Sequence, residues 1–153
     1  MADTSLSEKK IGLLVWQLSN LWQNKLRHIL KYYELTLNEY LVLESIYELK
    51  KHIILINQNI ISLFSGIDIS VVSVVLKLLE RKEFIKRTID KDNRKKTIEM
   101  LSNGEKTFNE IYPLINQEEE RIFEKLQSEK NNFTNSLKLI LGKKLRISAN
   151  KNL

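Results

Sequence analysis

The 153-residue sequence contains no cysteine, one proline, four glycines and two histidines. Without cysteine, disulfides, thiolate catalysis and thiol redox sensing are all excluded. With only His28 and His52 available, a zinc site would need carboxylates for most of its ligands, so we expect no metal site. The scarcity of glycine and proline leaves little room for long loops or a barrel. These absences favour helices joined by short connections.

Long apolar runs are also missing. The longest candidate, Ile53 to Ile56, is far shorter than the roughly 20 residues that a bilayer span needs. The N-terminal MADTSLSEKK is polar and lacks the apolar core of a signal peptide. We therefore expect a cytoplasmic protein with no membrane partner.

The patterns of common enzyme sites are absent as well. The sequence shows no glycine-rich phosphate loop, metal-ligand cluster or nucleophile–base constellation. The carboxylate run Glu118 to Glu120 is most simply a solvated helix face. We expect neither an enzyme nor a bound cofactor.

Positive charge is concentrated in two segments of a chain whose net charge is +6. Residues 77–96 hold nine cations and four acids, and residues 138–151 hold five cations and no acid. The rest of the chain is therefore acidic. Two basic segments on an acidic chain suggest a polyanionic partner, although two solvated faces would explain the charge equally well.

Apolar side chains recur at helical spacing in four segments. The first runs from Ser7, a plausible N-cap, to Tyr33, and the second from Leu37 to Leu49. In the second, Thr36 and Glu39 form a capping box, and the expected buried face consists of Tyr40, Leu43, Ile46 and Tyr47. The other two segments are Gly104 to Leu126, where Pro113 should kink or break the helix, and Asn131 to Leu145.

The middle of the chain carries the signals of a helix-turn-helix. After a short expected strand at Ile53–Ile56, Asn57 can cap a brief helix that ends near Phe64. Residues 65–68 predict a tight turn in which Gly66 takes positive φ, and Asp68 can cap a helix from Ile69 to about Lys82. A helix, a short glycine-containing turn and a second helix are typical of DNA-binding proteins.

The segment Ser70–Val75 also has strong strand propensity, because it contains four valines. The apolar set Val72, Val75, Leu76 and Leu79 nevertheless repeats at intervals of three and four residues. This spacing and the Asp68 cap favour a helix, which tertiary packing must then stabilise against β-branching. Beyond it, Phe84–Thr88 and Thr97–Leu101 predict two strands joined by a cationic hairpin at residues 89–96.

From Gly66 to Gly104 the sequence resembles the MarR/SlyA family of winged helix-turn-helix regulators. The resemblance is carried by Lys77-Leu78-Leu79-Glu80-Arg81-Lys82, by Phe84-Ile85-Lys86-Arg87, by Asp92-Asn93-Arg94 and by Leu101-Ser102-Asn103-Gly104. The family wing carries an Asp-x-Arg element. The flanking helices fit as well, so the resemblance extends over nearly the whole chain. It implies a mainly α-helical fold with a small β-hairpin wing, of the α+β winged-helix class.

The sequence departs from the family pattern at three positions. Glu83 stands where the family usually has glycine after the recognition helix, and Val74 where an arginine often projects from it. Leu101 replaces a common threonine before the next helix. Valine cannot make the bidentate guanine contact of arginine, but it can pack on a thymine methyl.

The resemblance implies that the helix from Asp68 to Lys82 enters the major groove of double-stranded DNA. Its candidate contacts are Ser70, Val71, Ser73, Val74 and Lys77. In the wing, Arg94 suits insertion into the minor groove, and Asn93 beside it is a further candidate. Candidate phosphate contacts are Arg87, Lys91 and Lys95, together with Lys96. A solvated hairpin stiffened by an Asp92–Arg94 pair is the alternative.

The long apolar stripes at both ends of the chain predict a homodimer that binds a pseudo-palindromic operator. Within one domain of residues 1–153, we assign DNA binding to 36–104 and dimerisation to 7–33 and 105–147. The resemblance also suggests a small phenolic or carboxylate effector in a cleft lined by aromatic residues. The candidates are Trp16, Trp22, His28, Tyr32, Tyr33, Tyr40 and Tyr47. A winged-helix module that binds protein rather than specific DNA is the competing interpretation.

Overall fold

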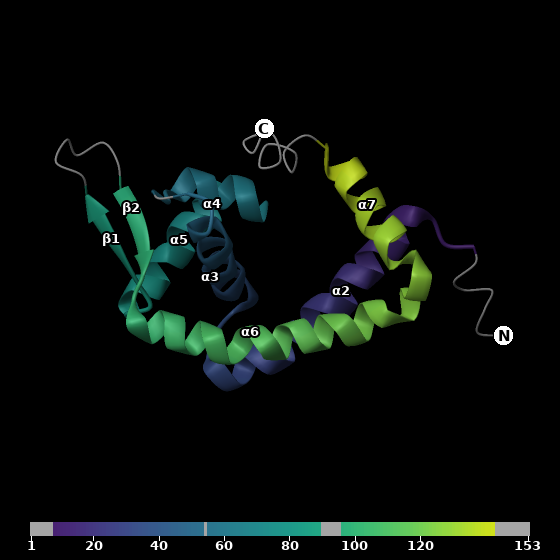
Figure 1. Cartoon of the computed structure of the whole chain (residues 1–153), viewed down its shortest axis with the longest axis horizontal. Helices are drawn as coiled ribbons and strands as arrows, with labels where there is room; N and C mark the ends of the chain where they lie inside the picture. Colours follow the sequence, from purple (N-terminus) through teal and green to yellow (C-terminus); the bar gives the residue numbers. More distant parts are fainter. Residues whose placement is uncertain (1–7, 54, 90–95, 143–153) are drawn as a thin grey trace.

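The computed structural model describes residues 8–53, 55–89 and 96–142. Eight α-helical and 3₁₀ segments and one β-hairpin dominate this part of the chain (Figure 1). In chain order the elements are α2 (Ile11–Leu30), η1 (Lys31–Tyr33), α3 (Leu37–Lys50), α4 (Gln58–Ser65), α5 (Ile69–Arg81), β1 (Ile85–Ile89), β2 (Lys96–Met100), α6 (Ser102–Phe123), η2 (Glu124–Glu129) and α7 (Lys130–Leu141).

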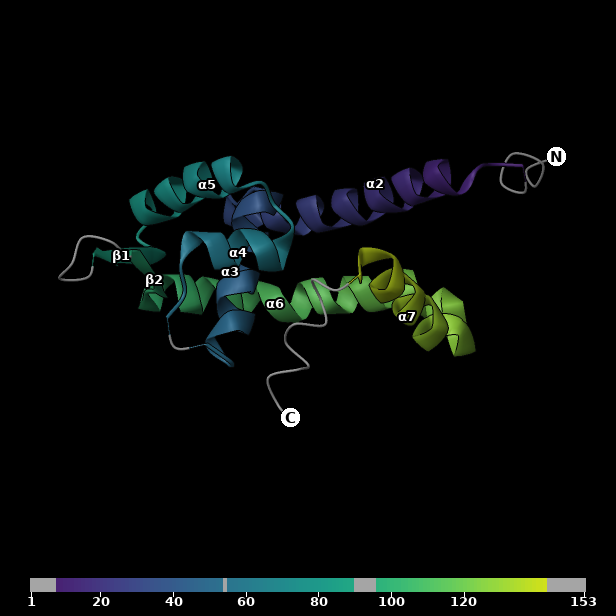
Figure 2. The ribbon, with the colours of Figure 1, turned by 90° about the horizontal axis from the view of Figure 1, so that it is seen from above.

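The long helix α6 joins two ends of an elongated molecule (Figure 1). At one end lie α3, α4, α5 and the hairpin, and at the other lie α7 and the start of α2. Figure 2 shows α2 and α6 running side by side, and the two helices are in contact. The hairpin pairs β1 with β2 in antiparallel register, from Ile85 opposite Met100 to Ile89 opposite Lys96. The predicted fold class, mainly α-helical with a two-stranded wing, is confirmed.

Helix α3 begins as its sequence predicts. The Thr36 hydroxyl accepts a hydrogen bond from the Glu39 N–H, and the Glu39 carboxylate accepts one from the Thr36 N–H, each at 3.1 Å. Tyr40, Leu43 and Ile46 are buried as expected, whereas Tyr47 is only half-buried. The capping box therefore fixes the start of a helix that crosses the centre of the core.

One hydrophobic core connects the helices with the wing. Its largest fully buried side chains come from every element from α2 to α6 except η1 and β2: Leu26, Leu30, Tyr40, Leu43, Ile46, Ile61, Leu76, Leu79, Ile85, Phe108, Ile111 and Ile115. Val72, Val75, Leu76 and Leu79, the predicted inner face of the valine-rich segment, are all buried. This burial is the tertiary packing that overrides the strand propensity of α5.

Two expectations about local structure are wrong. Of the apolar run 53–56, the described residues 53, 55 and 56 form no strand. Ile56 instead buries its side chain in the core, and its carbonyl accepts a hydrogen bond from the Ile98 N–H at 2.8 Å. Among the described residues of the run this is the one backbone hydrogen bond to β2, and one such bond does not make a third strand.

At Pro113 the expected alternative of a helix break is wrong, whereas the alternative of a kink stays a prediction. The helix runs from Ser102 to Phe123 through the proline. A proline within a helix costs one backbone hydrogen bond. The neighbouring Ile111 and Ile115 are fully buried, so core packing on both sides of Pro113 holds the helix together.

The first helix also starts later than expected, at Ile11 after Lys10, and Ser7 lies outside the described residues.

Candidate nucleic-acid interface

The turn between α4 and α5 is fixed by side chains that cap both helices. The Asn57 side-chain oxygen Oδ1 accepts the Ile60 N–H at 2.9 Å at the start of α4. Gly66 ends α4 with φ +78°, a left-handed conformation that glycine adopts without strain. Asp68 then starts α5 by accepting the Ser70 N–H at 2.8 Å. The chain bends by 115° between the two helices, within the range of a helix-turn-helix.

Asp68 is held in its charged form. The Ser70 hydroxyl, and then the Ser70 N–H, donate hydrogen bonds that lower the pKa of the Asp68 carboxyl. A carboxylate at the N-terminus of a helix also interacts favourably with the helix dipole. The first turn of α5 is thereby fixed, and the Ser70 hydroxyl proton is already engaged within the protein.

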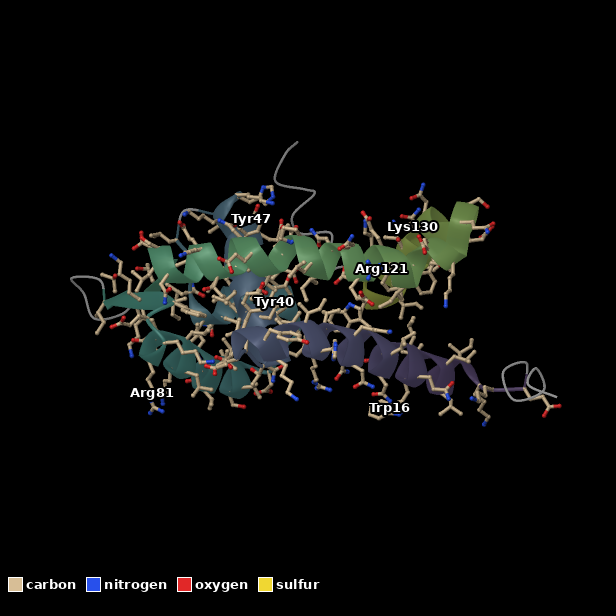
Figure 3. The ribbon with its side chains drawn as sticks, turned by 90° about the horizontal axis from the view of Figure 1, so that it is seen from below. Trp16, Tyr40, Tyr47, Arg81, Arg121 and Lys130 are labelled. Carbon is tan, nitrogen blue, oxygen red and sulfur yellow. The ribbon has the colours of Figure 1, made fainter. Side chains whose placement is uncertain are left out.

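Helix α5 lies at an outer edge of the molecule and presents one face to solvent (Figure 2). The exposed positions recur at helical spacing: Ser70, Val71, Val74, Lys77, Leu78 and Arg81. Figure 3 shows the Arg81 side chain pointing away from the body of the protein. Four of the five predicted contact residues of α5 share this face. The fifth, Ser73, is half-buried at its edge.

Sequence reasoning missed Arg81 as a contact residue. It lies four residues after Lys77, so the two cations share a line along the exposed face. The helical spacing from Lys77 was the signal that could have found it. The two side chains place positive charge on the C-terminal half of the face, which is the arrangement that phosphate contacts require.

The wing residue Arg87 is engaged inside the protein. Its Nε forms an ion pair with Oε1 of Glu80, and its side chain is mostly buried. The pair joins strand β1 to helix α5. Arg87 therefore positions the wing relative to α5, and its phosphate contact stays a prediction. The candidates Lys91, Asn93, Arg94 and Lys95 lie outside the described residues and stay predictions.

The base of the wing is held to α6 by a close backbone approach. The Leu101 N–H donates to the Phe84 carbonyl at 2.8 Å. A Cβ added to Gly104 would lie 2.2 Å from that same carbonyl oxygen. Only glycine therefore fits at this position, and the first turn of α6 lies directly against the chain that enters β1.

The exit from α5 has the left-handed geometry that usually calls for glycine. Glu83 has φ +58°. The Phe84 N–H donates to the Leu79 carbonyl and the Glu83 N–H to the Glu80 carbonyl, which is the pattern of a Schellman motif. The departure from the family glycine is thus tolerated without a change of backbone path.

The end of α5 is also tied to the start of α3. Lys82 Nζ lies 2.7 Å from Oε2 of the buried Glu39 and donates to the Glu34 carbonyl at 2.8 Å. Lys82 was counted from sequence as part of a basic segment, but its charge is used inside the fold. The exposed positive charge of this segment therefore comes from fewer residues than the composition indicates.

The seven residues predicted to line an effector cleft lie in several separate places. His28, Tyr32 and Tyr33 line an open pocket of about 370 Å³ between α2 and α6, with Arg121 at its edge. Tyr47 lines a different pocket, beside Phe108. Trp16 points away from the protein (Figure 3), and Tyr40 is fully buried. No single cavity unites the set among the residues that the structure describes.

An acidic and aromatic cluster lies between α3 and α6. Glu44 and Glu48 are one turn apart on α3, and Glu119 of α6 accepts a hydrogen bond from the Trp22 indole at 3.2 Å. Burial, followed by the charges of Glu119 and Glu48, raises the pKa of Glu44 to about 7. Burial and the charge of Glu44 likewise raise the pKa of Tyr40.

The described residues also bear on metal sites and membrane-spanning helices. No group of three His, Asp or Glu side chains within 8–53, 55–89 and 96–142 could hold a metal ion. In the same ranges no single helix is long and apolar enough to cross a membrane, although the sharply bent pair α4–α5 meets the length and composition requirements.

The comparisons with known proteins converge on one family. Residues 35–97, which contain α3, α4, α5 and β1, match the model of the MarR family. The uncharacterized HTH-type transcriptional regulator YdcH of Bacillus subtilis strain 168 is 28% identical over 131 residues, covering 85% of this chain and 88% of YdcH.

Solved structures share the fold at lower sequence identity. The Staphylococcus aureus MepR–DNA complex has a TM-score of 0.73 and 22% identity, covering 83% of this chain and 90% of MepR. CouR from Rhodococcus jostii RHA1, bound to p-coumaroyl-CoA, has a TM-score of 0.72 and 21% identity over 84% of this chain and 89% of CouR. With the helix-turn-helix and the wing in place, residues 35–97 of the chain match the MarR family, and the described structure shares the fold of these solved structures.

Proposed function

We propose that this protein is a sequence-selective regulator that binds a pseudo-palindromic site on double-stranded DNA as a homodimer. The exposed face of α5 carries the proposal. Ser70, Val71 and Val74 face outward in its N-terminal half, with Ser73 at the edge, and Lys77 and Arg81 face outward in its C-terminal half. A recognition helix meets base edges near its N-terminus, and cations fix its position on the phosphates.

In this proposal residues 36–104 bind DNA, and the wing contacts the duplex beside the recognition helix. Arg94 enters the minor groove, with Asn93 next to it, while Lys91 and Lys95 neutralise phosphates. Arg87 supports this arrangement indirectly, because its ion pair with Glu80 sets the direction of β1. The protein acts in the cytoplasm, where its DNA is.

Homodimerisation is supported by exposed apolar side chains at the end of the molecule away from the wing. Helix α7 buries none of its residues, and Leu139 and Ile140 are largely exposed. On α2, Ile11, Val15 and Trp16 are also exposed. A two-fold partner would cover these faces, which belong to the proposed dimerisation segments 7–33 and 105–147. Light scattering should give twice the 18.1 kDa of one chain.

A small phenolic or carboxylate effector is the third part of the proposal. The pocket between α2 and α6 brings Tyr32, Tyr33 and His28 together with Arg121, whose guanidinium lies 3.1 Å from Glu118. Aromatic rings and a cation suit a ring that bears a carboxylate. CouR, of the same fold, is bound to p-coumaroyl-CoA. Millimolar 4-hydroxybenzoate should weaken DNA binding by the native protein but not by Arg121→Met, whereas Lys125→Met should behave as the native protein does.

The experiment that tests DNA recognition is selection from a pool of duplexes with a randomised 20-base-pair centre, followed by footprinting on the selected sequence. The proposal expects one preferred sequence with two related half-sites about one helical turn apart. Recovery of unrelated sequences with equal affinity would contradict it. That result would favour the competing interpretation, a winged-helix module that binds protein.

A further inference from the structure

The chemistry of the exposed face of α5 is unusual for a surface that meets DNA bases. Between Ser70 and Lys77 its outward side chains are Val71 and Val74, and Leu78 and Ile69 extend the same apolar strip. Arginine, asparagine and glutamine, which make bidentate contacts with guanine or adenine, are missing from this part of the helix. The Ser70 hydroxyl already donates to Asp68. The N-terminal half of the face is therefore poor in free hydrogen-bond donors.

Of these apolar residues, Val74 is the most exposed and lies opposite the core face of the helix. The inner face of α5 consists of Val72, Val75, Leu76 and Leu79, all at most 4% exposed. Val74, in contrast, is 57% exposed. Exposed valine lowers helix propensity and gains nothing from burial in the free protein. Val74 is thus placed to be covered by something outside the chain.

The flanking charges point to what covers it. Lys77 and Arg81 continue the line of Val74 along α5, and both are exposed. A protein partner that buried the apolar strip would have to accommodate two adjacent cations at its end. Duplex DNA can contact both parts of this face at once. The phosphates that border the major groove can pair with the two cations, and apolar groups inside the groove can pack against Val74.

The major groove displays one apolar group on its base edges, the C5-methyl of thymine. Cytosine lacks this methyl at the same position of the ring. On the basis of the proposed function, which places α5 in the major groove, we propose that Val74, flanked by Val71, selects thymine by packing against its methyl group. The half-site then contains thymine at the position facing Val74. The recognition is by shape and burial rather than by hydrogen bonding.

The test replaces thymine by deoxyuridine at single positions of the duplex selected above. This change removes only the methyl group and leaves base pairing and groove hydrogen bonding unchanged. At one or two positions of each half-site, binding should weaken roughly fourfold, as expected for one buried methyl group. A duplex with a C·G pair in place of the T·A pair at this position should also bind more weakly. Using 5-methylcytosine in that C·G pair should restore part of the lost affinity, because it returns the methyl group.

Val74→Thr supplies the matching change on the protein, since it exchanges one methyl for a hydroxyl at nearly constant shape. For this variant the penalty for deoxyuridine should be clearly smaller at the facing position, because one of the two valine methyl groups is gone, and should persist elsewhere. Leu55→Thr is the control, because Leu55 lies outside α5 and is 57% exposed, like Val74. It should retain the full deoxyuridine penalty, whatever its overall affinity.

Three results overturn the inference in distinguishable ways. If a preferred duplex binds equally well with deoxyuridine at every thymine, methyl reading by Val74 is wrong while sequence-selective binding stands. If no preferred duplex exists, the proposed function and the inference fall together. A penalty that Val74→Thr leaves unchanged also contradicts the assignment, because another residue must then contact the methyl.

Discussion

Lys82 Nζ lies 2.7 Å from Glu39 Oε2, and this ion pair connects the C-terminal end of α5 to the first turn of α3. Glu39 is buried and also closes the capping box with Thr36. One carboxylate thus fixes the start of a core helix and the end of the recognition helix. The orientation of α5 relative to the core depends on both contacts.

Removing the cation should destabilise the fold. Lys82→Met leaves the Glu39 carboxylate buried without its partner, and we expect the free energy of unfolding to fall by about 2 kcal/mol. The control is Lys86→Met, which breaks the exposed Lys86–Glu99 pair on the wing and should change stability by less than about 0.5 kcal/mol. Urea unfolding measures both. Equal effects of the two variants would refute the structural role of Lys82.

Glu83→Gly should stabilise the protein by about 0.5–1 kcal/mol, because glycine adopts the left-handed conformation of this residue without steric strain. Glu83→Ala removes the same side-chain charge but keeps the Cβ, so it should bring no such gain. Thermal unfolding of the two variants separates backbone strain from charge. A gain shared by both would attribute the effect to charge instead.

Gly104→Ala should be strongly destabilising, by more than about 2 kcal/mol, since its Cβ would collide with the Phe84 backbone. Gly12 offers the matched control. It lies in α2 with no atom within 4 Å of an added Cβ, so Gly12→Ala should stabilise by up to about 1 kcal/mol through helix propensity. Denaturant unfolding reads both changes. A neutral Gly104→Ala would show that α6 and the wing are not in close contact.

The pKa of Glu44, raised to about 7, predicts that stability depends on pH. The folded protein holds the Glu44 proton more tightly than the unfolded chain, whose carboxyl has the ordinary pKa of 4.5. The associated stabilisation is fully present below pH 4.5 and is lost as pH rises through 7. The groups that face Glu44 are Tyr40 and Glu48 of α3 and Glu119 of α6.

Glu44→Gln should therefore be more stable than the native protein above pH 7, by an amount on the order of 1–3 kcal/mol, and this advantage should shrink towards pH 5. Unfolding curves at pH 5 and pH 8 measure it. Glu110→Gln, on an exposed position of α6, is the control and should show no such difference. An advantage of Glu44→Gln that is constant with pH would contradict the raised pKa.

Much of this architecture could be predicted from the sequence, because its signals are local. The Thr36–Glu39 box, the Asn57 cap, Gly66 and Asp68 each act within a few residues, and the structure contains all four contacts. Helical spacing also identified which valines of α5 face the core. Local capping and periodicity are readable without knowledge of the fold.

The errors arose where distant contacts decide the outcome. Pro113 stays within a helix because Ile111 and Ile115 are buried against other elements. The run 53–56 lacks a strand because Ile56 packs into the core and makes one hydrogen bond to β2. Arg87 and Lys82 looked like free cations, yet Glu80 and Glu39 engage them. The number of charged residues in a segment does not show which of them form ion pairs with residues far away in the sequence.

The salt dependence of duplex binding tests most directly that the exposed face of α5 contacts DNA. The slope of log affinity against log salt concentration counts the phosphates that a protein neutralises. Lys77→Ala and Arg81→Ala should each reduce its magnitude by about 1 per binding subunit. Lys130→Ala, far from α5 at the start of α7 (Figure 3), should leave it unchanged. Equal slopes for the native protein, Lys77→Ala and Arg81→Ala would contradict the contact.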